Sequence, residues 1–243
     1  MRFTFRPLPG LTVACTILFA ILIGLGVWQL QRLHWKLGLI AMMNRNMHVA
    51  AVSLDAPGKI YEESETEYLH VAATGRFDNG KEAYVFATGP EGAPVFHVLV
   101  PFTLKDGRVY MVDRGIVPRD MKDPSTRPGG IVNRDTKIVG YWRWAQAPGT
   151  FTPPPDRAHR IWFSRDVIDI ARADGVTLAQ PALIEADAAP NPGGWPRGGQ
   201  TVVDIRNEHL QYAITWFLMA AALFGVYLAY HASKGRLGLT SKD

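Results

Sequence analysis

The chain has 243 residues and a formal net charge of +4 at pH 7, and only 20% of its residues are charged. Residues 31–207 carry 21 Lys and Arg against 20 Asp and Glu, so the excess positive charge lies in the tails. The near-neutral middle argues against a nucleic-acid-binding protein. The single cysteine, Cys15, excludes a disulfide within the chain and any site built from paired cysteines.

A first apolar segment, residues 11–30, has no charged side chain and is long enough as a helix to cross a hydrocarbon core of about 30 Å. We predict a transmembrane helix over 10–31. A cleaved signal peptide is the alternative, but this run is longer than is usual for one, and Val27-Trp28-Gln29 lacks the small residues of a cleavage site. The helical pattern continues, which predicts an extension over 32–48.

The middle of the chain has the pattern of short strands. Runs of β-branched and aromatic residues alternate with turn sequences such as Asp78-Asn79-Gly80, which predicts hairpins of an antiparallel sheet. One amphipathic helix fits residues 165–174, with Gly175 as its stop. The expected strands are 69–77, 82–88, 95–104, 108–117, 137–143 and 182–186.

A second apolar segment runs from Leu210 to Tyr230 and predicts a transmembrane helix over 208–230. With the first helix, it flanks a domain over 32–207. The fold class expected is a membrane protein with two transmembrane α-helices flanking a β-rich α+β extramembrane domain.

The charges near the two helices indicate the orientation. The tails, 1–9 and 231–243, are rich in Lys and Arg, so the positive-inside rule places both in the cytoplasm and the domain outside it. Arg32, Lys36 and Arg45, just after the first helix, favour the opposite orientation.

The sequence contains none of the common catalytic signatures. It has no Walker loop, no GxGxxG fingerprint, no GxSxG elbow and no HExxH motif, and its histidines are not spaced as a ligand set. His34, His48, His159 and His231 are expected at surfaces or interfaces. We therefore expect a protein that is not an enzyme.

The start of the second apolar segment is unusually polar and aromatic. At 100° per residue, His209, Tyr212, Ala213 and Trp216 share one helix face. One interpretation is an interfacial belt with a hydrated histidine. The other makes His209 an axial ligand of haem iron, with Tyr212 and Trp216 packed against the porphyrin.

The end of the first apolar segment has a similar face. Gly24, Trp28, Gln31, Arg32 and Trp35 project to one side. An aromatic belt with a snorkelling arginine explains this pattern. A haem slot between the two helices, with Arg32 facing a propionate, is the alternative.

Five motifs occur in a fixed order along the chain. They are LGVWQLQRLHWK at 25–36, GRFD at 75–78, VDRGIVP at 112–118, GGWPRGG at 193–199 and RNEHLQYAITWF at 206–217. Together they resemble the surfeit-locus family of cytochrome c oxidase assembly factors, in a bacterial form, over nearly the whole length.

The resemblance implies a function. It implies an inner-membrane protein with a periplasmic domain that binds haem a and aids its insertion into oxidase subunit I. The haem-binding histidine of the family matches His209, and its aromatic neighbours match Tyr212 and Trp216. Subunit I and membrane lipid are the expected partners, with haem a synthase as a further candidate and no nucleic acid.

One departure from the family pattern is visible, because Ile116 stands where the family has tryptophan. Asp113 and Arg114 are expected to form a structural pair, and Gly75 to permit a bulge or a close backbone approach. The competing function is a docking factor that stabilises a subunit I intermediate without haem.

Overall fold

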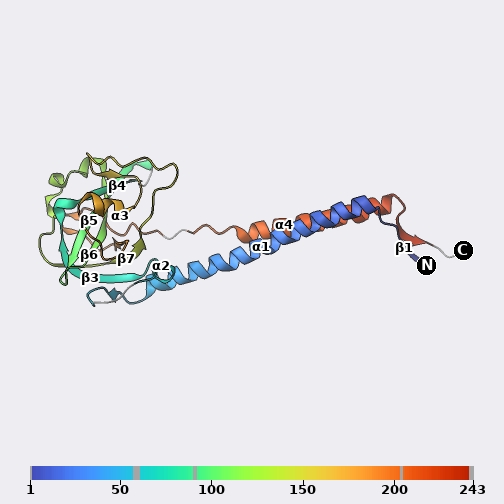
Figure 1. Ribbon diagram of the computed structural model, residues 1–243, viewed down its shortest axis with the longest axis horizontal. Helices are drawn as coiled ribbons and strands as arrows, with labels where there is room; N and C mark the ends of the chain where they lie inside the picture. Colours follow the sequence, from blue (N-terminus) through green and yellow to red (C-terminus); the bar gives the residue numbers. More distant parts are fainter. Residues whose placement is uncertain (1, 57–60, 90–91, 203–204, 241–243) are drawn as a thin grey trace. The chain divides into compact units, whose positions relative to one another are not determined.

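The computed structural model describes residues 2–56, 61–89, 92–202 and 205–240. It divides into two units, which we describe separately. The helical unit comprises Met1–Ala41 and Asp204–Asp243, and the sheet domain comprises Met42–Val203. Figure 1 shows the helices and strands of both units.

Two long helices form most of the helical unit. Helix α1 spans Pro9–His48, which confirms the predicted continuation to residue 48, and α4 spans His209–Ser233. Both are long and apolar enough to cross a membrane. They run side by side in opposite directions, with the Thr12 and Tyr227 hydroxyls 2.8 Å apart near one end (Figure 1).

A small ribbon joins the two tails, for which we predicted no regular structure. Strand β1, Arg2–Phe5, pairs antiparallel with β10, Leu237–Thr240. His231, expected at a surface or an interface, is fully buried beside this ribbon. Its Nε2 accepts from the Leu8 amide at 3.3 Å, and its Nδ1 donates to the Tyr227 carbonyl at 2.9 Å. Both ring nitrogens of His231 are therefore engaged.

The predicted strand segments all form strands of one eight-stranded sheet in the described part of the domain. The sheet is mixed rather than antiparallel, since the pairs β2–β3, β4–β8 and β6–β9 are parallel. The strands are β2 Val52–Ser53, β3 His70–Phe77, β4 Ala83–Thr88, β5 Pro94–Leu104, β6 Val109–Pro118, β7 Thr136–Trp144, β8 Ile161–Trp162 and β9 Ala182–Ala186.

The central strands close into a ring. The sheet order β3-β7-β9-β6-β5 is completed by a direct pairing of β3 with β5. One apolar core uses alternate residues of these strands, among them Val100, Val112 and Trp142. The intervening residues, such as Leu99 and Met111, pack against α3, Val167–Ala173, on the other face. The short helix α2 spans Glu63–Thr66.

Gly75 lies where the ring closes. It pairs with Thr136 of β7 on one side and with Leu104 of β5 on the other. A Cβ on Gly75 would overlap the carbonyl oxygen of Thr103 and lie 2.9 Å from the Phe102 ring. The predicted close backbone approach is confirmed, and it explains why this position requires glycine.

Gly75→Ala should destabilise the sheet domain by about 1–3 kcal/mol, because the backbone of β5 cannot yield to the new methyl group without loss of pairing. The measurement is thermal or denaturant unfolding of the full chain in detergent. Gly80→Ala is the matched control, since its Cβ would meet only Asp78 Oδ1 at 3.7 Å. Equal stability of the two variants would contradict the account of the ring closure.

Candidate functional site

The histidine predicted as a haem ligand begins α4 and contacts α1. His209 Nδ1 lies 2.7 Å from the side-chain oxygen Oε1 of Gln29. An amide oxygen can only accept a hydrogen bond, so Nδ1 carries the proton and donates it. In the neutral imidazole, Nδ1 then carries the proton and the lone pair lies on Nε2.

A close approach of the two helices allows this contact. Gly26 is buried in α1, and a Cβ there would lie 2.6 Å from the Phe217 ring of α4. On α4, Ala213 and Ala220 are only 1% exposed. Because Gly26 and Gln29 are three residues apart, they lie on the same face of α1. This seam of small residues holds Gln29 against His209.

The aromatic residues predicted for the site are exposed or partly buried on the two helices. Trp28 and Trp35 are 53% and 56% exposed, and Tyr212 is 52% exposed. Trp216 is partly buried. Arg32 is exposed and stacks 4.2 Å above the Trp35 ring.

Sequence reasoning missed Gln29, although it stands in the LGVWQLQR run. It assigned the neighbouring face of α1, with Trp28 and Arg32, to the site. Helical periodicity shows which residues share a face, but gives no rotation of one helix against another. The glycine one turn before Gln29, at Gly26, was the available signal, because small residues mark close helix contacts in membranes.

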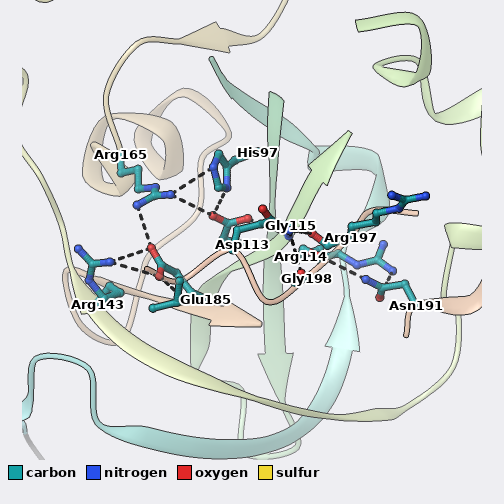
Figure 2. Close-up of polar contacts among 12 residues, drawn as sticks. His97, Asp113, Arg114, Gly115, Arg143, Arg165, Glu185, Asn191, Arg197 and Gly198 are labelled. Carbon is teal, nitrogen blue, oxygen red and sulfur yellow. Dashed lines mark hydrogen bonds and ion pairs between the residues drawn. The ribbon is translucent and has the colours of Figure 1, made fainter. Parts of the chain in front are cut away.

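The sheet domain contains a separate cluster of buried charges, shown in Figure 2. His97 Nδ1 lies 2.7 Å from Asp113 Oδ2, and Arg165 contacts His97 Nε2 at 3.3 Å. Arg165 also contacts Glu185 at 2.9 Å, which pairs with Arg143 at 3.1 Å. Each carboxylate of the cluster meets a basic side chain, so the cluster is internally paired. No group of metal-ligating side chains occurs among the described residues.

Asp113 and Arg114 do not form the predicted pair with one another. Asp113 accepts from the Gly115 amide at 2.9 Å and faces His97. Arg114, the next residue of β6, donates to the carbonyl of Gly130 at 2.8 Å and to Asn191 Oδ1 at 3.2 Å (Figure 2). Successive residues of a strand point to opposite faces, which separates the two side chains.

Two of the family-like motifs pack directly on each other. Ile116 and Arg197 exchange two backbone hydrogen bonds, each of 2.9 Å. Gly115 has φ +108° and lies against the carbonyl of Arg197, so no side chain fits there. The GGWPRGG segment is thus fixed to the VDRGIVP strand through backbone contacts. This pairing does not use the side chain of Ile116, the position that departs from the family pattern.

Glu185→Gln should destabilise the sheet domain by about 1–3 kcal/mol, because the buried Arg143 and the partly exposed Arg165 each lose a carboxylate partner, although Arg143 keeps Glu67. Unfolding of the full chain in detergent measures the loss. Asp135→Asn, which breaks an ion pair with Arg76 whose side chains are 53% and 63% exposed, should cost less than about 1 kcal/mol. A loss for Glu185→Gln no larger than this control would refute a stabilising role for the cluster.

Comparison with known proteins agrees with the motifs. A sequence model of the SURF1 family matches residues 16–221. Surfeit locus protein 1 of Xenopus tropicalis is 36% identical over 217 residues, which cover 82% of this chain and 68% of that protein. The human protein of the same name is also 36% identical, over 82% and 70% of the two chains, and the Takifugu rubripes protein 32%, over 87% and 92%. This chain belongs to the SURF1 family.

Proposed function

We propose that the chain is an assembly factor for cytochrome c oxidase that carries haem a, with Nε2 of His209 as the axial ligand of the iron. The observation that carries this proposal is the hydrogen bond from His209 Nδ1 to Gln29, because it uses Nδ1 and makes Nε2 the nitrogen with the lone pair in the neutral ring. Neutral imidazole binds haem iron through such a nitrogen. Membership of the SURF1 family supports a role in the assembly of cytochrome c oxidase.

The chain's own residues fit a porphyrin as cargo. The exposed rings of Trp28, Trp35 and Tyr212 offer apolar faces, and Trp216 follows His209 by about two helical turns. Arg32 supplies a cation for a propionate. Since Gly26 and Phe217 bring the helices close together, the ring belongs at the end of this seam, near His209, rather than deeper between the helices.

Gln29 has a positioning role in this proposal. A hydrogen bond to the second nitrogen of a ligating histidine orients the ring and increases its basicity. A single histidine ligand, with apolar burial, holds the haem without the strength of two axial ligands. The cargo can then pass to a recipient that offers two ligands, such as subunit I.

The partners and the location follow from this role. Oxidase subunit I receives the haem and haem a synthase is a candidate donor, and neither step requires catalysis by this chain. The bacterial inner membrane holds both helices, with the sheet domain in the periplasm and both tails in the cytoplasm. A docking factor that stabilises subunit I without haem is the alternative.

The decisive test is the absorption spectrum of the full chain purified in mild detergent from cells that make haem a. Wild type should contain stoichiometric haem a, and His209→Ala should lose it or change its spectrum. His34→Ala is the matched control, since His34 is an exposed histidine of α1 whose Nδ1 lies 2.8 Å from the Leu30 carbonyl of the same helix. Haem absent from the wild type would favour the docking factor, and equal haem in wild type and His209→Ala would remove His209 from the site.

Gln29→Leu should weaken haem binding by about 10- to 100-fold, the range typical for loss of a hydrogen bond to a ligating histidine. Titration of the haem-free chain with haem measures the change. Gln211→Leu removes an exposed amide of α4 on the side of the helix opposite His209, and should leave the affinity unchanged. If both variants bind haem as the wild type does, the positioning role of Gln29 is wrong.

The orientation is tested with a reporter enzyme inserted after Asp106, in the exposed turn between β5 and β6. A reporter active only outside the cytoplasm should be active at this point, since the proposal places the sheet domain in the periplasm. If a reporter that is active only in the cytoplasm were active at this point, the sheet domain would lie in the cytoplasm. That result would contradict the proposed orientation.

A further inference from the structure

Arg114 is a buried cation whose described contacts include no carboxylate. It is 1% exposed, and its Nη2 donates to two neutral acceptors, the Gly130 carbonyl and Asn191 Oδ1. Its Nε and Nη1 have no hydrogen-bond partner among the described residues. The guanidinium stacks 4.6 Å from the Phe77 ring, which partly compensates its charge.

The other buried arginines of the domain are paired differently. Arg127 contacts Glu82 at 2.5 Å, and Arg143 contacts Glu67 at 2.7 Å as well as Glu185. A buried charge is normally compensated in this way, because burial without an opposite charge is costly. Burial lowers the pKa of Arg114 to about 10, although the charge of Glu82 opposes this shift. The site of Arg114 is thus short of negative charge.

A cavity of about 130 Å³ adjoins Arg114 at one end of the strand ring. Two exposed cations, Arg134 and Lys137, also line it, whereas its one carboxylate, Asp187, already accepts from the Ala189 amide at 3.0 Å. Part of the remaining wall is aliphatic, with Val112, Val132, Ile138 and Val139 among its side chains.

We propose that this cavity binds a short aliphatic carboxylate, with the anionic end toward Arg114 and the hydrocarbon part along the aliphatic wall. The three cations outnumber the single carboxylate, which favours an anion over a neutral or cationic ligand. The mixed lining favours an organic acid over a purely inorganic anion. The carboxylate can belong to a free small acid or to an acidic side chain of a protein partner.

A purely structural role for Arg114 predicts different behaviour. The side chain joins the loop at Gly130 to the loop at Asn191, and this role requires no ligand. It predicts that carboxylates have no saturable effect on the domain and that Lys137, which makes no contact in that junction, is irrelevant to any effect observed.

The test is thermal unfolding of the full chain in detergent, titrated with sodium propionate at constant ionic strength and pH 7. Propionate should raise the unfolding temperature with saturation, and propionamide, its neutral analogue, should not. N-acetylglutamate amide tests a side-chain carboxylate in the same way. Saturation by propionate alone would indicate a free acid, and saturation by the capped glutamate alone a protein side chain. No saturable effect of either, or an equal effect of propionamide, would overturn the proposal.

Variants test whether the effect of propionate on the unfolding temperature arises in this cavity. Lys137→Gln should raise the midpoint concentration of propionate by roughly fivefold, as expected for one lost exposed charge pair. Lys105→Gln, in the turn between β5 and β6, is the matched control and should leave the midpoint unchanged. Arg114→Met should abolish the effect, and Lys137→Gln still decides the question if that variant does not fold. Equal midpoints in the two lysine variants would exclude this cavity.

Discussion

Two polar side chains can meet within a helix pair only where the backbones approach closely, and Gly26 against Phe217 provides that approach in this chain. One turn further along α1, Gln29 reaches His209 on α4. The orientation of the imidazole and the tautomer of its neutral form depend on this seam. By contrast, both ring nitrogens of His231, at the opposite end of α4, are hydrogen-bonded within the protein.

In the sheet domain, buried charged side chains are generally compensated by opposite charges. Its ring of strands closes at Gly75, its apolar core fills the interior, and nearly all of its buried charges meet opposite ones. Arg114 departs from the rule, and it lies beside a cavity with further cations. Departures from local consistency in a folded chain tend to occur at functional positions. This departure is the reason for proposing a second site in the sheet domain, separate from the one proposed at His209.

Much of this architecture could be predicted from the sequence. The two apolar helices and the strand segments have strong local patterns, and their positions are confirmed. The parallel pairings and the ring closure could not be predicted, since they depend on contacts between distant residues rather than on local periodicity. The same holds for the burial of His231, which is due to the ribbon formed by the two tails.

The site was predictable only in part. His209, Tyr212 and Trp216 could be proposed from the sequence because an ionisable residue beside aromatic ones at a membrane entry is unusual. Gln29 was missed because the rotation between two helices is set by packing, here at Gly26. Arg114 was expected to be paired with Asp113, but the alternation of the strand sends the two side chains to opposite faces.

The central claim concerns one atom, Nε2 of His209, and it can be tested at that atom. The haem-loaded full chain would be prepared twice, with histidine carrying ¹⁵N at Nε2 in one sample and at Nδ1 in the other, and studied by electron-nuclear double resonance of the oxidised iron. The account predicts the coupling of a directly bound nitrogen in the Nε2-labelled sample only, and its loss in His209→Ala. The same coupling in the Nδ1-labelled sample, or from no histidine nitrogen at all, would contradict it.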